Sequence, residues 1–351
     1  MTRKAISKEV GNMKPYELES AARALVAKGK GILAADESLP TIQKRFAALG
    51  IESTEETRRA YREMLFTTQR VEEFISGVIM FDETIRQKAG DGTSFVDVLN
   101  RKGVVPGIKV DKGTADLPAF PGEKITAGLD GLRERLKEYR EMGAGFTKWR
   151  AVITIGPGIP TRSCISANAQ TLALYAAFSQ EAGLVPIVEP EVLMEGDHDI
   201  KRCQEATEAA LTSVFSGLRQ YGVALEGMLL KPSMVLPGRW SPMQASVAEV
   251  AETTIRCLKR VVPAAVPGIV FLSGGQSPEL ATEHLNAMNA MGEHPWEISF
   301  SFARALQEPA LKAWRGTAAN VPAAQRQFYH RAKCNSAARY GRYSEQMEMA
   351  A

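Results

Sequence analysis

Lys231 is the residue whose place in the sequence points most directly to chemistry. It ends the apolar run Met228-Leu229-Leu230 and precedes Pro232. Such a run is too short for a core helix and is typical of a buried parallel strand. An ammonium group there is costly unless it is paired or loses its proton, and the neutral amine is a nucleophile for carbonyl groups. The alternative is a lysine that extends from the strand end into solvent.

Polar groups recur at the ends of eight short apolar segments. The segments are residues 31–36, 74–82, 104–110, 146–152, 184–191, 225–231, 268–273 and 296–302. Barrel enzymes place their chemistry at the C-terminal ends of such strands, so the pattern favours an active site over unrelated surface charges. The polar groups are Asp36, Asp82, Lys109, Lys148, Arg150, Glu189, Glu191, Lys231, Ser273, Ser301 and, just beyond the last segment, Arg304.

The spacing within these segments predicts contacts between particular side chains. Residues two apart on a strand point to the same side, so Lys148 pairs with Arg150 and Glu189 pairs with Glu191. Because neighbouring strands lie about 4.8 Å apart, a row Lys148–Glu189–Lys231 is expected. Such a row places a carboxylate able to move protons beside a nucleophilic amine. A structural salt-bridge network across the barrel is the alternative.

Two other places in the sequence are suited to binding phosphate. Ser273-Gly274-Gly275 follows the seventh segment and leads into a helix beginning at Ser277-Pro278. Glycines let backbone N–H groups approach an anion, and the helix N-terminus adds a favourable dipole. Arg304 follows the eighth segment, which in barrels is the other frequent phosphate position. A second cationic group, Lys44-Arg45, follows Ser38 after the first segment, so a substrate with a phosphate at each end is predicted.

The elements that must position these residues repeat along the chain. The eight apolar segments alternate with helical patterns, some with capping boxes at their starts, such as Ser53 with Glu56 and Ser246 with Glu249. This alternation predicts an α/β fold, a (β/α)8 TIM barrel with additional N- and C-terminal helices. We expect one barrel domain over residues 1–351, with a mobile C-terminal tail at about residues 334–351.

Composition excludes several other classes of protein. The net charge of +3 on 351 residues is spread evenly, and the one basic stretch, residues 312–342, fits a solvated helix face, so no nucleic-acid partner is expected. No run is long enough to span a membrane, and no signal peptide is evident. The four cysteines form no C-x-x-C pair and the histidines no metal-binding motif, which indicates reduced thiols and no metal or cofactor. A cytoplasmic protein is expected.

At these residues the chain resembles class I fructose-1,6-bisphosphate aldolase, the metal-independent Schiff-base type. The resemblance extends from about Tyr16 to about Lys333. The motifs that carry it are Gly31-Ile32-Leu33-Ala34-Ala35-Asp36-Glu37-Ser38, Phe146-Thr147-Lys148-Trp149-Arg150, Val188-Glu189-Pro190-Glu191, Leu230-Lys231-Pro232 and Phe271-Leu272-Ser273-Gly274-Gly275-Gln276-Ser277.

The resemblance implies reversible cleavage of fructose 1,6-bisphosphate to dihydroxyacetone phosphate and glyceraldehyde 3-phosphate, in glycolysis and gluconeogenesis. It implies that Lys231 forms the imine, that Glu189 is the main proton-transfer residue, and that Asp36, Lys148 and Glu191 assist. It also implies a cytoplasmic homo-oligomer, often a tetramer. The residues implied to hold the two phosphates or line the cleft are Ser38, Arg45, Lys109, Arg150, Ser273, Gly274, Ser301 and Arg304.

The chain departs from the animal members of that family at three places. Leu39-Pro40-Thr41 stands where they have Thr-Gly-Ser, Phe302-Ala303 replaces a Tyr-Gly pair, and the chain ends in Met349-Ala350-Ala351 instead of tyrosine. Two other functions stay open. One is a Schiff-base barrel aldolase for deoxyribose or heptulose phosphates, against which a second phosphate site argues. The other is a non-catalytic scaffold on the aldolase fold.

Overall fold

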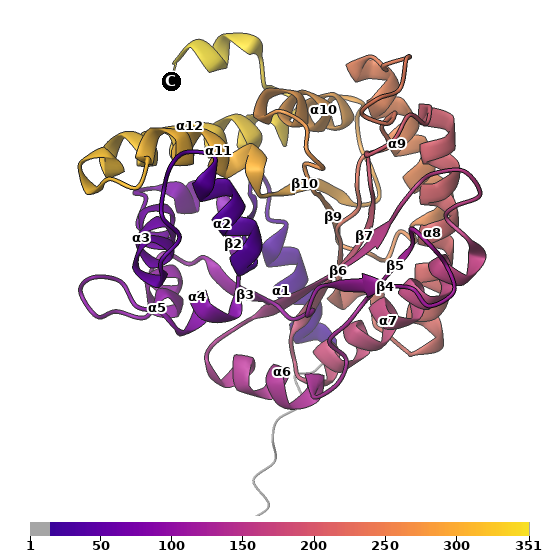
Figure 1. The fold of residues 1–351 in the computed structure, drawn as a ribbon, viewed down its shortest axis with the longest axis horizontal. Helices are drawn as coiled ribbons and strands as arrows, with labels where there is room; N and C mark the ends of the chain where they lie inside the picture. The colour runs from indigo at the N-terminus through magenta and orange to yellow at the C-terminus, as the bar shows by residue number, and fades with distance from the viewer. Residues whose placement is uncertain (1–14, 351) are drawn as a thin grey trace, which may run out of the picture.

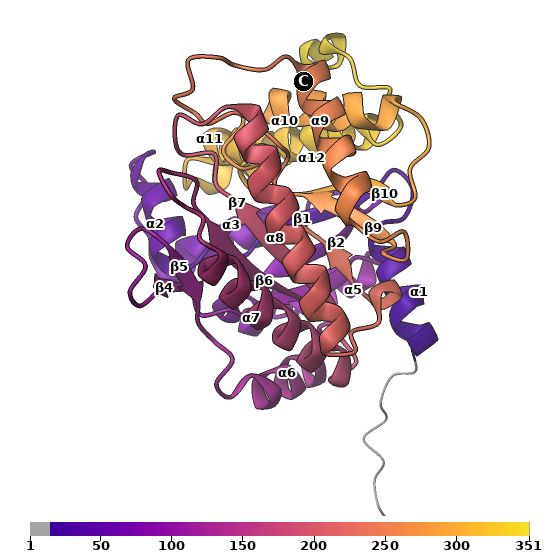
Figure 2. The same cartoon turned by 90° about the vertical axis from the view of Figure 1, so that its right-hand side faces the viewer.

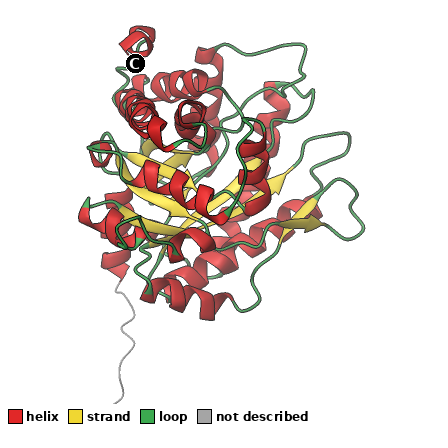
Figure 3. Ribbon diagram, turned by 60° about the vertical axis from the view of Figure 1, so that its left-hand side comes forward, coloured by secondary structure: helices red, strands yellow, loops and turns green. Residues whose placement is uncertain are grey.

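The computed structural model describes residues 15–350 and contains a closed parallel barrel. Going round the barrel, the strands are β1 (Gly31–Ala35), β2 (Ile75–Met80), β3 (Val105–Lys109), β6 (Phe146–Ile153), β7 (Val185–Val192), β8 (Leu229–Leu230), β9 (Gly268–Phe271) and β10 (Glu297–Phe302), which pairs with β1. Figures 1 and 3 show these strands at the centre of a ring of helices. The predicted (β/α)8 barrel is confirmed.

Helices cover the outside of the barrel, as the turned view in Figure 2 also shows. Most of the strands are buried on both faces, because their outward side chains pack against the helices. The covering helices are α2 (Leu39–Ala47), α3 (Glu55–Phe66), α4 (Asp82–Arg86), α5 (Phe95–Arg101), α6 (Leu132–Glu141), α7 (Arg162–Glu181), α8 (Ile200–Gln220), α9 (Val247–Val261), α10 (Pro278–Ala290) and α11 (Arg304–Trp314).

The additional helices lie at the two ends of the chain, as predicted. α1 (Pro15–Leu25) places Leu18, Leu25 and the following Val26 in one cluster with inward-facing strand residues such as Phe146 and Val185. α1 therefore packs against the apolar end of the barrel interior. α12 (Val321–Ala338) packs on α10 and α11 and is followed by a short 3-10 helix, Glu345–Ala350. No helix among residues 15–350 is both long and apolar enough to cross a membrane.

Alternation along the strands divides the barrel interior into two layers. On β6 the interior residue Phe146 is followed two positions later by Lys148, and on β7 Val185 and Ile187 are followed by Glu189. The apolar members of these series fill the half of the barrel next to α1. The polar members lie at the C-terminal ends of the strands. The same alternation of side chains therefore places apolar residues in the core and charged groups at the C-terminal rim of the barrel.

The structure corrects three details of the predicted elements. The segment 225–231 forms strand only at Leu229–Leu230, because residues 225–227 make a 3-10 turn before it. A short antiparallel ribbon, β4 (Thr114–Asp116) with β5 (Lys124–Thr126), was not predicted. The predicted Ser53 cap is wrong: Thr54 caps α3 and exchanges hydrogen bonds with Thr57 at 3.1 and 2.9 Å.

The C-terminal segment has a defined position on the barrel through residue 350. Arg339 is buried and donates hydrogen bonds to the Ala27 carbonyl at 3.1 Å and the Ser299 hydroxyl at 3.0 Å. Tyr343 is 8% exposed, and its backbone N–H donates to Asn286 on α10 at 2.8 Å. The predicted mobility of residues 334–351 concerns dynamics and stays a prediction. The predicted domain of residues 1–351 includes residues 1–14 and 351, which lie outside the described residues.

Candidate active site

A cavity of about 1230 Å³ opens at the C-terminal ends of the barrel strands. It brings together nearly every side chain that the sequence analysis selected. Gly275 does not line it but lies beside Gly274 in the same turn. The predicted residues that line the cavity are Asp36, Ser38, Arg45, Lys109, Lys148, Arg150, Glu189, Glu191, Lys231, Ser273, Gly274, Ser301 and Arg304.

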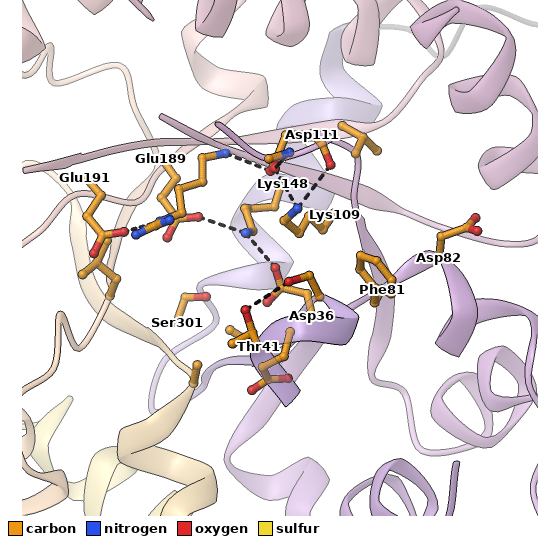
Figure 4. A pocket seen from close by; sticks show the side chains of 18 of the residues that line it. Asp36, Thr41, Phe81, Asp82, Lys109, Asp111, Lys148, Glu189, Glu191 and Ser301 are labelled. Carbon is orange, nitrogen blue, oxygen red and sulfur yellow. Dashed lines mark hydrogen bonds and ion pairs between the residues drawn. The ribbon is translucent and has the colours of Figure 1, made fainter. Parts of the chain in front are cut away.

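Four buried charged groups form the centre of the cavity. The Lys148 amine lies 2.6 Å from the Asp36 carboxylate and 3.3 Å from Glu189 Oε2, and the Lys231 amine lies 3.3 Å from Glu189 Oε1. Figure 4 shows Asp36, Lys148 and Glu189 pointing toward one another. The expected row Lys148–Glu189–Lys231 is therefore present, with Asp36 extending it at one end.

Burial and neighbouring charges oppose each other at this centre. Burial alone would raise the pKa of Asp36, but Lys148, Lys231 and Lys109 outweigh it and lower that pKa to about 2. Burial alone would lower the pKa of Lys148, but Asp36, Glu189 and Asp111 outweigh it and that pKa is raised. The pair is thus held as carboxylate and ammonium.

Five lysines line the cavity, of which Lys44 and Lys112 are exposed; the other three, Lys109, Lys148 and Lys231, differ in how tightly they are paired. Lys148 contacts two carboxylates, and the Lys109 amine lies 2.7 Å from Asp111. Lys231 has one carboxylate, Glu189, at 3.3 Å, which is longer than a good N–H···O hydrogen bond. Glu189 Oε2 has no hydrogen-bond partner among the described residues, and its contact with Lys148 at 3.3 Å is an ion pair without good hydrogen-bond geometry. Among Lys109, Lys148 and Lys231, Lys231 is thus the most weakly ion-paired.

The first predicted phosphate site has its donors in place. Gly274 and Gly275 have φ of +58° and +89°, a conformation that favours glycine, and they form the turn between β9 and α10. The hydroxyl of Ser301 is buried in the cavity wall without a hydrogen-bond partner. Ala303 has a negative φ of −101°, outside the left-handed region that favours glycine, and it keeps its backbone N–H.

The second predicted phosphate site lies where α2 begins. The Ser38 hydroxyl lies 3.0 Å from the Thr41 hydroxyl, and both residues line the cavity with Arg45. The guanidinium of Arg45 contacts the buried carboxylate of Glu37, which also binds Arg62 at 2.6 Å. Glu37 fixes Arg45 in place, and Ser38 together with Thr41 places two hydroxyls at the helix N-terminus.

Sequence reasoning missed several polar residues of the cavity region, among them Thr41, Asp111 and Arg239. Thr41 and Asp111 line the cavity, and Asp111 pairs with Lys109 directly after β3. Arg239 was not selected, because it lies in the long loop between β8 and α9, far from any strand end. A Cβ at Gly275 would lie 2.5 Å from Arg239 Nη2 and 3.1 Å from Arg304 Nη2, so both guanidinium groups converge on this turn. Burial, with the charges of Arg45 and Arg239, lowers the pKa of Arg304.

The fold and the cavity together define a (β/α)8-barrel enzyme whose centre pairs a buried amine with a carboxylate. The family model described as Fructose-bisphosphate aldolase class-I matches residues 17–351. The chain belongs to the class I fructose-bisphosphate aldolase family. These enzymes cleave fructose 1,6-bisphosphate reversibly through a lysine Schiff base without a metal, so the function and enzyme class predicted from the sequence are confirmed.

Individual relatives agree with this assignment. The "Probable fructose-bisphosphate aldolase class 1" of Xanthomonas campestris is 56% identical over 93% of this chain and 98% of its own length. "Fructose-bisphosphate aldolase 4, cytosolic" of Arabidopsis thaliana is 52% identical over 94% of this chain and 84% of its own. The Plasmodium falciparum aldolase, solved in complex with TRAP and a small molecule inhibitor, superimposes with a TM-score of 0.93 at 48% identity, covering 94% and 96% of the two chains.

The lowered pKa of Asp36 predicts how stability depends on pH. Asp36 titrates at about 2 in the folded protein against an ordinary 3.8, so its contribution is complete above about pH 4 and disappears as the pH falls toward 2. Because each unit represents about 1.36 kcal/mol, the contribution is on the order of 2 kcal/mol. In chemical denaturation, the difference in unfolding free energy between wild type and Asp36→Asn should be largest near pH 6 and shrink between pH 4 and 2. The exposed Asp130→Asn should show a constant difference; a constant difference for Asp36→Asn would contradict the prediction.

Proposed function

We propose that Lys231 is the Schiff-base nucleophile of this aldolase. The observation that carries the proposal is its pairing: Lys148 and Lys109 are held by close carboxylates, whereas Lys231 faces Glu189 alone at 3.3 Å. The amine of Lys231 attacks the ketone carbon of the substrate, water leaves, and a protonated imine remains that withdraws electrons.

Glu189 is proposed to move protons in the steps that follow. It first protonates the hydroxyl that leaves as water, and its carboxylate then takes the proton of the C4 hydroxyl while the C3–C4 bond breaks. The bonding electrons pass into an enamine on Lys231, and glyceraldehyde 3-phosphate leaves. Asp36 is the weaker candidate for this base, because its pKa of about 2 and its ion pair with Lys148 at 2.6 Å disfavour protonation. Protonation of the enamine and hydrolysis release dihydroxyacetone phosphate.

The remaining charged residues are proposed to position the substrate. Lys148 keeps its charge and orients Asp36 and Glu189. Glu191 pairs with Arg150, and Lys109 with Asp111, on the cavity wall. The sites at the two ends would take the two phosphates of fructose 1,6-bisphosphate: Ser273, Gly274, Gly275, Ser301 and Arg304 at one end, Ser38 and Arg45 at the other.

Assembly and location follow the family in this proposal. A homo-oligomer, a tetramer by family resemblance, is expected, and the sugar phosphates are its small-molecule partners. A cytoplasmic location is supported by relatives such as the Arabidopsis enzyme that is named cytosolic. Light scattering on the purified protein would measure the oligomeric state.

Covalent trapping tests the role of Lys231. Borohydride reduction in the presence of dihydroxyacetone phosphate should add the substrate mass to the peptide that contains Lys231, and Lys231→Ala should acquire none. Because the proposed chemistry uses no metal ion, cleavage activity should survive EDTA. Peptide mapping by mass spectrometry reads the site directly. Label on Lys148 or Lys109 in the wild type would overturn the assignment.

Glu189→Gln tests the proton-transfer role, because it keeps the shape of the side chain and removes the base. General acid–base catalysis contributes about 10²–10⁴-fold, so kcat should fall by that range. Steady-state kinetics with fructose 1,6-bisphosphate provides the measurement, and Glu226→Gln, an exposed residue beside β8, is the matched control. A kcat equal to that of the control would assign proton transfer to another group.

Arg45→Ala distinguishes the two phosphate sites. Hydrogen bonds to charged groups contribute about 1.5–3 kcal/mol, so kcat/KM for fructose 1,6-bisphosphate should fall by about tenfold or more. Fructose 1-phosphate lacks the second phosphate and should be much less affected. Arg304→Ala should weaken both substrates. Equal losses for both substrates in Arg45→Ala would place Arg45 outside the second site.

Arg239 is expected to support the phosphate at the Ser273 turn, because its guanidinium converges there with that of Arg304. Neither arginine has a carboxylate within ion-pair distance among the described residues. Since Arg239 is exposed, its contribution should resemble that of a surface ion pair, and Arg239→Ala should raise KM by about two- to fivefold for both sugar phosphates. The effect should shrink as salt is added. Arg219→Ala, an exposed arginine at the end of α8, is the control, and an equal KM in both variants would exclude Arg239.

A further inference from the structure

A second cluster of side chains lies outside the cavity, where the C-terminal segment meets α12. His330 and Cys334 are four residues apart on α12 and therefore lie on one face of that helix. The 3-10 helix Glu345–Ala350 brings Glu348 against the same face. The imidazole nitrogen, the thiol sulfur and a carboxylate oxygen all lie within 4.8 Å of one another. None of these three residues lines the cavity.

The distances within this cluster are compatible with ligands around a metal ion. His330 Nε2 lies 3.5 Å from Glu348 Oε2 and 3.5 Å from Cys334 Sγ. The first distance is longer than a good N–H···O hydrogen bond. Around tetrahedral Zn²⁺, bond lengths of about 2.0–2.3 Å place neighbouring ligand atoms about 3.3–3.6 Å apart. Both distances therefore match the edges of a zinc site.

The surroundings of Glu348 orient its carboxylate as a ligand. Its Oε1 atom accepts hydrogen bonds from the Tyr343 hydroxyl at 2.6 Å and from Arg331, which leaves Oε2 facing His330. Arg331 is itself held by the Pro278 carbonyl at 3.0 Å and the Thr282 hydroxyl at 2.6 Å. Outer hydrogen bonds of this kind fix carboxylate ligands in metal sites.

Burial and charge also bear on the ability of the cluster to bind a cation. Cys334 is fully buried, whereas the His330 and Glu348 side chains are 13% and 22% exposed, which leaves a route for an ion and a water ligand. The charges of Arg331 and Lys333 on α12 oppose a cation. A thiolate and the Glu348 carboxylate would supply two negative charges against them, and Glu279 on α10 also stands near the thiol.

We propose that His330, Cys334 and Glu348 bind one Zn²⁺ ion, with water as the fourth ligand, and that the ion fastens the C-terminal segment to α12. Binding displaces the thiol proton to solvent and forms bonds from sulfur, nitrogen and oxygen to the metal. Because the thiol has to lose its proton to bind the ion, binding should tighten as the pH rises. The ion would act on the position of the segment and take no part in the aldol reaction.

Cobalt substitution tests the site on the full chain. After treatment with a chelator, the protein should bind one equivalent of Co²⁺ and show the near-ultraviolet thiolate-to-cobalt absorption band, and Zn²⁺ should displace the cobalt. Cys334→Ser should abolish the band, and Glu348→Gln should weaken Zn²⁺ binding by more than about tenfold, the change that 1.4 kcal/mol represents. Glu345→Gln, in the same segment but outside the cluster, and Cys257→Ser, a buried cysteine on α9, should behave like the wild type.

Limited proteolysis provides a readout of the segment itself. Zn²⁺ should slow cleavage after Arg342 in the wild type and in Glu345→Gln, and should have no effect on Glu348→Gln. Circular dichroism shows that each variant is folded. Absence of the cobalt band in the wild type, or its persistence in Cys334→Ser, would overturn the site. Zinc binding that is unchanged in Glu348→Gln would overturn the attachment of the segment.

Discussion

The position of Glu189 between two lysines is the interaction on which this active site depends. Burying an isolated carboxylate or ammonium costs several kcal/mol, and a buried ion pair recovers that cost only with good geometry. Here two carboxyl groups and two lysine amines alternate from Asp36 through Lys148 and Glu189 to Lys231. The two inner residues of the row, Lys148 and Glu189, each lie between two groups of the opposite type. The alternation lets four ionisable groups occupy a barrel interior that would otherwise be apolar.

The alternation in charge is set by the geometry of the barrel. In the β6–β7 ladder, Lys148 lies opposite Ile187 and Glu189 lies opposite Arg150. Lys148 therefore reaches Glu189 diagonally, two positions further along the neighbouring strand, which is within range of a long side chain. The stagger that closes the barrel thus decides which lysine contacts which carboxylate. Lys231 completes the row because its N–H continues the ladder, donating to the Val188 carbonyl at 2.8 Å just beyond the short strand β8.

The two ends of the cavity handle positive charge in different ways. At α2, Arg45 is neutralised in advance by Glu37, which also binds Arg62, so its position is fixed before any ligand arrives. At the β9–α10 turn, Arg304 and Arg239 converge without a carboxylate partner among the described residues. An anion would relieve their mutual repulsion, so in the proposed function this end binds its phosphate through electrostatic attraction and the other end through prepared geometry.

Local patterns in the sequence determined the strands, the rim residues and the row around Glu189, because a period of two in a buried strand fixes which side chains share a side. The motifs from Asp36 to Ser277 were sufficient to indicate the aldolase family. What the sequence left open was set by contacts between distant segments. Arg239 reaches the Ser273 turn from another loop, and Glu348 meets His330 only because the chain folds back over α12. Such contacts between distant segments cannot be predicted from a local sequence pattern, because they depend on how helices pack and where loops cross. The sequence already selected Lys231 as the candidate nucleophile. The tertiary structure added the distances that separate its weak pairing from the close pairing of Lys148 and Lys109, because those distances depend on how the strands pack.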